Sequence, residues 1–158
     1  MPPITRLGST SPRISLYLPH IPASIEEYHT HPTAEQLIAT NSNHWRKIIT
    51  IAAKLACPNE EWRQFRDLQL FRDIALIFTP ELETHSGWHW LGGKDNQQRF
   101  GLDTTGLKPV AGAKDVWIDI RRKLLLTPYP DYRQLSNATI ATIRATLHRE
   151  GFYSSEMV

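Results

Sequence analysis

Runs of apolar residues along the chain predict a series of short β-strands. Residues 13–19 (RISLYLP) alternate apolar and polar side chains, which is the pattern of a strand with one buried face. Residues 74–80 (IALIFTP) are a continuous apolar run, too short for a helix, that is typical of a strand covered on both faces. Residues 87–93 (GWHWLGG) predict a further strand, and residues 116–120 (VWIDI) and 123–129 (KLLLTPY) predict two more.

Apolar residues at helical spacing predict helices between the first two of these strands. Thr33 followed by Gln36 is a capping-box pattern, which begins a short helix. Residues 43–56 place tryptophan, isoleucine and alanine side chains on one helical face, so they predict a longer, amphipathic helix. Another helix is expected to follow Pro58.

Two further helices are predicted in the second half of the chain. Asp95 with Gln98 is again a capping-box pattern, so residues 96–100 are expected to form a short helix. Ser136 is expected to cap the last helix, and Gly151 is expected to end it.

Strands separated by helices are typical of an α/β fold, and we expect a three-layer αβα single domain with a short, mostly parallel central sheet. The domain is expected to cover residues 13–153, after a loose arm at residues 1–12 and before a tail at residues 154–158. The secondary structure of residues 113–122 is left undecided between strand and helix. The pair Arg121–Arg122 is poor chemistry for a tight hairpin, so a helix across residues 113–122 competes with the strand prediction.

The expected fold also indicates where a ligand would bind. In open α/β sheets, ligands bind beyond the carboxyl ends of the strands. Three loops follow predicted strands in this way, at residues 20–31, 92–94 and 127–133.

The composition is that of a globular protein, and it excludes several kinds of site. The chain has 158 residues, of which 41% are hydrophobic and 22% charged, and one cysteine, Cys57. A single cysteine excludes an intrachain disulfide, a four-cysteine zinc site and an iron–sulfur cluster, and cytoplasm is the expected location. The N-terminus lacks the apolar stretch of a secretory signal, and no stretch suits a membrane span, so we expect no membrane partner. We also expect no cofactor.

The charge balance does not by itself predict a nucleic-acid partner. The formal net charge is +2, from 18 Lys and Arg against 16 Asp and Glu, whereas phosphate contacts need a concentrated basic face. A basic face confined to one part of the surface is still compatible with this net charge. The run RRK at residues 121–123, with Tyr129, Tyr132 and Arg133, can form a basic, aromatic-lined patch, or it can be a solvated turn.

The glycines from Gly87 to Gly93 depart from the phosphate-binding loop G-x-x-x-x-G-K-[ST]. Gly93 occupies the lysine position, Lys94 comes one place late, and Asp95 replaces the hydroxyl residue. Two interpretations remain. The Gly92–Gly93 turn at a helix N-terminus, with Lys94 beside it, can hold an anion, or the glycines only let the chain turn sharply.

Histidine pairs raise the question of a metal. His85 and His89 are four residues apart, and His29 and His31 are two apart. No third ligand at a suitable spacing completes a zinc site, so we predict no metal.

Candidate groups for chemistry lie on the same loops and strands. His20, His89 and Asp131 are the candidates for a general base, although Asp131 can equally form a turn. Trp88, Trp90 and Trp117 can stack on bases, or they can pack in the core, where Trp88 and Trp90 would share one face of their strand.

Three stretches resemble the uracil-DNA glycosylase superfamily: NHWRKIITIAAKL at 43–55, WLGGKDNQQRFGL at 90–102 and LLLTPYPDYRQLSNATIATIRATL at 124–147. The resemblance implies a parallel four-stranded sheet between helices, in which one strand ends in a Gly-rich turn and the last leads to a loop and a final helix. Tyr129-Pro130-Asp131 stands where that superfamily has His-Pro-Ser, and the loop LPHIPAS lacks its glycine-rich catalytic motif. The chain also resembles an uncharacterised family of small bacterial proteins.

These features predict a protein that binds nucleic acid or a nucleotide on a glycosylase-like scaffold without clear catalytic residues. Its predicted binding residues are Gly92, Gly93, Lys94, Arg121, Arg122, Tyr129 and Arg133. The cations would contact phosphates, and Tyr129 or Trp88 would contact a base. Two alternatives stay open: an enzyme acting on a nucleobase or a small phosphorylated substrate, and a protein–protein interaction domain.

Overall fold

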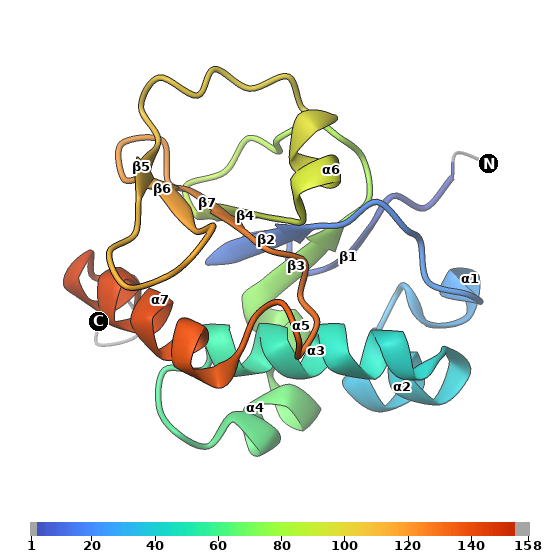
Figure 1. Cartoon of the computed structure of the whole chain (residues 1–158). Helices are drawn as coiled ribbons and strands as arrows, with labels where there is room; N and C mark the ends of the chain where they lie inside the picture. The colour runs from blue at the N-terminus through green and yellow to red at the C-terminus, as the bar shows by residue number, and fades with distance from the viewer. Residues whose placement is uncertain (1–2, 154–158) are drawn as a thin grey trace.

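A seven-stranded sheet runs through the part of the chain that the structure describes, residues 3–153 of a computed structural model (Figure 1). Its strands are β1 (Arg6–Gly8), β2 (Ile14–Tyr17), β3 (Ile74–Ile77), β4 (Trp88–Gly92), β5 (Lys108–Pro109), β6 (Trp117–Asp119) and β7 (Leu124–Thr127). The helices are α1 (Ile25–Tyr28), α2 (Ala34–Thr40), α3 (Asn43–Ala56), α4 (Trp62–Leu68), α5 (Leu70–Asp73), α6 (Lys94–Gln98) and α7 (Asn137–Arg149). The strands lie in the order β1-β3-β2-β4-β7-β6-β5.

The sheet is mixed, so the prediction of a mostly parallel sheet is wrong. The four central strands β3, β2, β4 and β7 run parallel, whereas β1 at one edge and β6 and β5 at the other pair antiparallel. β1 comes from the segment at residues 1–12 that we expected to be a loose arm, and it pairs with residues 75–77 of β3. The predicted tail at residues 154–158 lies outside the described residues.

Residues 117–127 form a hairpin, which decides against the competing helix across residues 113–122. β6 pairs antiparallel with β7, and Lys123 at the end of the turn has a positive φ of 54°. The carboxylate of Asp119 accepts hydrogen bonds from the backbone N–H of Arg122 (3.1 Å) and from its Nε (2.6 Å). This side-chain bracket stabilises the turn without the Asn-Gly pair that tight hairpins prefer.

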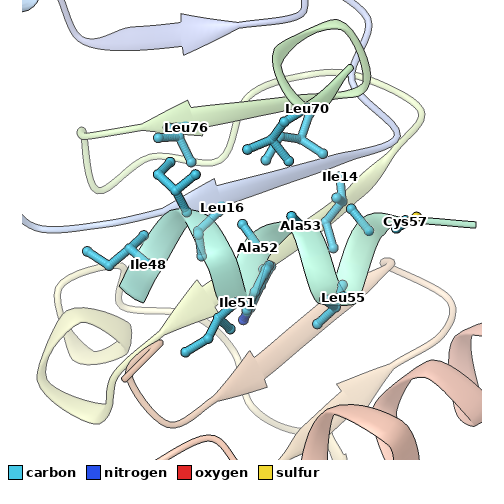
Figure 2. Packing of buried hydrophobic residues seen from close by; sticks show 14 of the residues in the cluster. Ile14, Leu16, Ile48, Ile51, Ala52, Ala53, Leu55, Cys57, Leu70 and Leu76 are labelled. Atoms are coloured by element: carbon cyan, nitrogen blue, oxygen red, sulfur yellow. The ribbon is translucent and has the colours of Figure 1, made fainter. Parts of the chain in front are cut away.

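The main core lies between the sheet and helix α3. Nine residues of α3 are buried, and Ala52 and Ala53 are small enough to let the helix approach the sheet closely. Figure 2 shows the α3 side chains among Ile14 and Leu16 of β2, and Leu76 of β3. Trp88 and Trp90 of β4 belong to the same core, so their predicted packing against a helix is confirmed.

The opposite face of the sheet has a smaller core. Alternate residues of the central strands, among them Tyr17, Leu91 and Leu124, pack there beneath Phe100 and Leu102. Helix α6 and the long connections around it cover this face (Figure 1). The sheet is therefore a middle layer with helices on both sides.

The helix caps predicted at Thr33 and Ser136 are confirmed, whereas Asn43, which we expected to cap α3, is its first residue and follows the N-cap Ser42. The side-chain oxygens of Thr33 and Ser136 accept the backbone N–H groups three residues on, at 3.1 and 3.2 Å. Helix α6 begins earlier than the predicted capping box, because Gly93 is its N-cap residue and Asp95 lies within its first turn.

Arg144 of α7 holds the end of α3 against α7. Its Nη1 donates to three backbone carbonyl groups at that end, those of Lys54 (2.8 Å), Leu55 (3.0 Å) and Cys57 (2.6 Å). The last carbonyl groups of a helix have no partner within the helix, and a cation there also interacts favourably with the helix dipole.

Replacing Arg144 with alanine is expected to lower the free energy of unfolding by about 2–3 kcal/mol, because these carbonyl groups lose a charged donor. Urea unfolding measures the change. Arg149→Ala on the same helix is the control, since its guanidinium makes one long bond, to Thr146 Oγ1 (3.3 Å), within the described residues. We expect that substitution to change stability by less than about 0.5 kcal/mol. Equal losses in the two variants would contradict this account of α7.

Candidate functional site

Strands β2, β4 and β7 end side by side at one end of the sheet, which we call the carboxyl edge. From β2 the chain moves outward to β3, and it then returns past β2 to β4 on the other side. In open α/β sheets, ligands bind in the crevice where the strand order reverses in this way. The loops after β2, β4 and β7, which the sequence singled out, lie at this end of the sheet.

Gly92 and Gly93 let the loop after β7 pack directly against the end of β4. A Cβ atom on Gly92 would lie 2.9 Å from Pro130 Cδ, and one on Gly93 would lie 3.1 Å from Tyr129 Cδ1. Gly93 also has a φ of 94°, which side chains other than glycine rarely adopt. The glycine pair thus provides a sharp turn and a close approach that together set the position of Tyr129.

Three ring side chains from separate elements meet at the carboxyl edge: His20 after β2, His44 in the first turn of α3, and Tyr129 after β7. We call them the edge cluster. His44 Nε2 and the Tyr129 hydroxyl form a hydrogen bond of 2.9 Å, and the two rings are stacked with centroids 5.3 Å apart. The His20 ring lies 6.4 Å from that of His44 and 6.5 Å from that of Tyr129.

The three residues of the edge cluster are all at least partly accessible to solvent. His20 is exposed, whereas His44 and Tyr129 are half-buried. Burial, with a smaller contribution from the negative charge of Asp131, raises the pKa of Tyr129 to about 12. The phenol therefore stays protonated at neutral pH and can act as a hydrogen-bond donor beside the two histidines.

Two polar side chains of α6 satisfy the carbonyl groups at the strand ends. Asn96 is buried, and its Nδ2 donates to Tyr17 O (2.8 Å). Gln97 Nε2 donates to Leu91 O (3.0 Å) and Thr127 O (2.8 Å). Through these bonds α6 is attached to the ends of β2, β4 and β7, and it stabilises the carboxyl edge.

The Gly92–Gly93 turn does not offer its N–H groups as an anion site. The N–H of Gly93 donates to Thr127 O at 3.0 Å, and α6 has only five residues. Lys94 is exposed at the start of α6, so it remains available to a phosphate as a side chain.

A groove continues from the carboxyl edge toward strand β6. Its volume is about 440 Å³, and it is lined by Lys94, Gln97, Asp115, Trp117, Thr127, Pro128 and Gln134. Trp117 is 42% exposed, which is unusual for so large an apolar side chain. The groove therefore places a free indole ring and a lysine beside the end of β7.

Arg121 and Arg122 lie at the opposite end of β7 from the edge cluster. They occupy the turn before β7, and β7 spans four residues, or about 13 Å at about 3.3 Å per residue. Arg122 is also engaged with Asp119. The structure therefore does not bring these arginines together with Tyr129 and Arg133 in the single basic patch that the sequence allowed.

Two further candidates are held in structural roles. Asp131 follows the edge cluster, and its carboxylate accepts the N–H of Arg133 at 2.9 Å in a tight turn. Trp88 is 4% exposed, so it is not available to stack on a base.

His89, the remaining general-base candidate, is buried on the α6 side of the sheet. It is 7% exposed, and its Nδ1 lies 2.7 Å from the Tyr17 hydroxyl. That hydroxyl also accepts the backbone N–H of Glu83 (3.0 Å), so it links His89 to the segment before β4.

His85 stacks on His89, with ring centroids 4.5 Å apart. Its Nδ1 accepts the backbone N–H of Gly87 (3.0 Å), which leaves Nε2 to donate to the Ser15 hydroxyl (2.9 Å). Burial lowers the pKa of both histidines. The pKa of His89 falls to about 4, with the neighbouring His85 as the second cause. The pair is neutral at neutral pH and is held by hydrogen bonds to Tyr17, Ser15 and Gly87, which is a structural role.

No group of three or more potential metal ligands comes together within residues 3–153. Over the same residues, no helix has the length and apolar character needed to cross a membrane.

The fold and the edge define an α/β protein whose strand ends carry an open cluster of histidine and tyrosine rings. The chain belongs to the family of unknown function DUF6942, whose model matches residues 5–148. No curated protein matches the chain, and no solved structure matches it. Membership confirms the expected similarity to an uncharacterised family. The comparisons give no support to the glycosylase resemblance, which rests on the sequence stretches alone.

Sequence reasoning placed His20, Tyr129, Lys94 and the glycine pair near one another, but it missed His44. The available signal was a histidine at the start of the helix that follows the first loop. A helix that packs under a parallel sheet presents its first turn to the carboxyl edge. This position depends on tertiary packing, so residue spacing along the chain does not predict it.

The buried histidine pair predicts that stability falls in mild acid. In the unfolded chain these histidines bind protons near pH 6.5, whereas in the fold His89 does so near pH 4. Because the unfolded state then binds more protons, stability is complete above about pH 6.5 and is lost as the pH falls toward 4. Replacing His89 with glutamine removes this titration but keeps an acceptor for Tyr17.

Thermal and urea unfolding between pH 7 and pH 4 tests the prediction. The loss of unfolding free energy over this range is expected to be about 2–3 kcal/mol smaller in His89→Gln than in the parent chain. His29→Gln is the matched control, because His29 is exposed. An unchanged pH dependence in His89→Gln would contradict the assignment of a buried, neutral pair.

Proposed function

We propose that the carboxyl edge binds a base of a nucleic acid or nucleotide. The observation that carries the proposal is the meeting of His20, His44 and Tyr129 at the ends of parallel strands, where the strand order reverses. Flat ring faces stack on any base, and ring nitrogens and a phenol can hydrogen-bond to base edges.

Solvent access supports this assignment. Each ring of the edge cluster is at least partly exposed, while Trp88, Trp90 and His89 are buried. The Tyr129 hydroxyl is protonated at neutral pH, and burial raises its pKa to about 12. The edge cluster is thus both reachable and chemically suited to a planar, hydrogen-bonding ligand.

The neighbouring surface supports a ligand larger than a free base. Lys94 and the exposed Trp117 line the groove beside the edge cluster, and Arg133 is exposed on the loop that carries Tyr129. We therefore propose Lys94 and Arg133 as phosphate contacts. Arg121 and Arg122 lie too far along β7 to serve the same site.

The glycosylase resemblance, which rests on the sequence stretches alone, implies a four-stranded parallel sheet; this sheet has seven strands and is mixed, so only its four central strands are comparable. Four parallel strands lie between helices, β4 ends in the Gly92–Gly93 turn, and β7 leads through Tyr129 to the final helix. This resemblance supports base binding at the carboxyl edge.

A cytoplasmic location remains a prediction from the single cysteine.

A second candidate function is an enzyme that acts on the bound base. The specific observation is that His20 is exposed beside the hydrogen-bonded His44 and Tyr129, so it is the general-base candidate that a ligand at the carboxyl edge can reach. His89 is buried, and Asp131 is held in a turn. Release of free base from a uracil-containing oligonucleotide, abolished by His20→Ala, would establish this function.

Binding of a fluorescently labelled single-stranded oligonucleotide, followed by anisotropy, tests the proposed function. Tyr129→Ala is expected to weaken binding by about 5- to 100-fold, because a stacked base contributes about 1–3 kcal/mol. Tyr129→Phe keeps the ring and is expected to lose less, only the hydrogen-bonded part. Arg121→Ala is the control, since Arg121 is exposed at the far end of β7.

The two variants of Tyr129 distinguish the outcomes. Strong loss with alanine and partial retention with phenylalanine would support base stacking at the carboxyl edge. No binding at low salt, or equal effects of Tyr129→Ala and Arg121→Ala, would contradict it.

A further inference from the structure

The outer side of helix α3 carries cations that are held over aromatic rings. Lys47 Nζ and Lys54 Nζ lie 5.8 and 5.7 Å from the centre of the Tyr132 ring. Lys54 Nζ also lies 4.9 Å from the centre of the Trp62 ring, and the guanidinium of Arg63 lies 4.4 Å from the same ring. We call Lys47, Lys54, Arg63 and the two rings the α3 stripe.

The cations of the α3 stripe are not compensated by acidic side chains. Within residues 3–153, no carboxylate lies within ion-pair distance of Lys47, Lys54 or Arg63. Arg66, the next arginine of α4, is by contrast paired with Asp67 at 2.9 Å. Burial and the nearby charge of Arg63 lower the pKa of Lys54, as expected where positive groups crowd together. Charges of one sign gathered in this way attract an anionic partner.

The stripe is continuous with the edge cluster. His44 and Lys47 are three residues apart on α3 and share a face of the helix. Lys54 follows on the same side, ten residues or about 15 Å beyond His44 at about 1.5 Å per residue. Tyr132 comes three residues after Tyr129 on one loop, so both the helix and the loop connect the two surfaces.

A hollow of about 360 Å³ adjoins the stripe and gives it depth. It is lined by Lys54, Tyr132, Leu135, Ser136 and Asn137. Lys54 Nζ donates to Asn137 Oδ1 at 3.0 Å, which fixes the ammonium group at the mouth of the hollow. A positioned ammonium beside an exposed tyrosine ring suits a phosphate next to a base.

We propose that the α3 stripe binds the sugar–phosphate backbone of a single-stranded nucleic acid whose base enters the edge cluster. The proposal rests on the proposed function for the identity of the ligand. A track of cations beside a surface that binds a base suits a single strand, because the cations contact the phosphates of the backbone while the base lies in the neighbouring site. A base must also be unpaired to reach a crevice at the end of a sheet.

An anionic membrane is the competing partner, and the side chains of the stripe disfavour it. Binding in the membrane interface needs apolar side chains projecting beside the cations. Here the rings of Trp62 and Tyr132 are each covered by cations instead. The nucleic-acid assignment is therefore the one we test.

The test measures binding of a labelled oligothymidylate of about ten nucleotides, a length within the range of single-strand sites. The stripe variant combines Lys47→Gln, Lys54→Gln and Arg63→Gln. The control variant combines Lys108→Gln, Lys114→Gln and Arg121→Gln, which removes the same charge from exposed positions near β5, β6 and the β6–β7 turn. Thermal unfolding verifies that all proteins are folded, and titrations at about 50 and about 200 mM salt give the salt dependence.

The stripe variant is expected to bind about tenfold more weakly or worse at low salt. The slope of log K against log salt should fall by about 2, since each phosphate contact on a single strand contributes about 0.7. The control variant should keep both the affinity and the slope. Equal losses in the two variants, or no loss in the stripe variant, would overturn the proposal. Displacement of the oligonucleotide by phosphatidylserine vesicles that bind equally well would also overturn it.

Failure of the proposed function would give a different result. If the edge cluster does not bind a base, Tyr129→Ala will leave oligonucleotide affinity unchanged while the stripe variant still loses affinity and slope. That combination supports a backbone contact at the stripe and rejects base binding at the edge. If both surfaces act together, Tyr129→Ala lowers affinity without changing the salt slope, because it removes no charge.

Discussion

The close approach between the β4 turn and the loop after β7 is the constraint on which the carboxyl edge depends. A Cβ atom on Gly92 would lie 2.9 Å from Pro130, so only glycine lets the two segments meet without displacement. That contact holds Tyr129 over the end of the sheet, where it stacks on His44 of α3. A helix and a loop that are 85 residues apart in sequence are thereby joined by a hydrogen bond at one point.

The polar groups of the sheet are divided between two roles by their access to water. On the α6 side, Tyr17, His85 and His89 are hydrogen-bonded to one another, to Ser15 and to the backbone, and they are largely buried. At the carboxyl edge, the same residue types are half-buried or exposed, so solvent and a ligand can reach them. Burial explains the difference: a buried polar group must be hydrogen-bonded, whereas an open one can exchange water for a ligand. Structure alone separates the two sets, because both are tyrosine and histidine.

The local elements could be predicted from the sequence, because hydrophobic periodicity and capping residues act over a few neighbours. The strands at 14–17, 74–77 and 88–92 and the caps Thr33 and Ser136 are examples. β1 escaped prediction because three residues carry little pattern, and it is stabilised by pairing with β3. The β6–β7 turn was misleading because Asp119, outside the turn, stabilises it through Arg122.

Part of the candidate site was also predictable, since the carboxyl ends of strands meet once the sheet is parallel at its centre. His20, Lys94 and Tyr129 were identified on this basis. His44 and the α3 stripe were not, because they depend on how a helix lies under the sheet. The basic surface was expected at Arg121 and Arg122, where charge is dense in the sequence, whereas the crowded cations in the fold come from α3 and α4.

Photocrosslinking tests the central claim, base binding at the carboxyl edge, most directly. An oligonucleotide carrying a photoreactive thiobase would be bound, irradiated and digested, and the modified peptide identified by mass spectrometry. The account predicts crosslinks to Tyr129, His44 or His20, and their loss when an unmodified oligonucleotide competes. Crosslinks confined to the turn at residues 120–123, at the other end of β7, would contradict it.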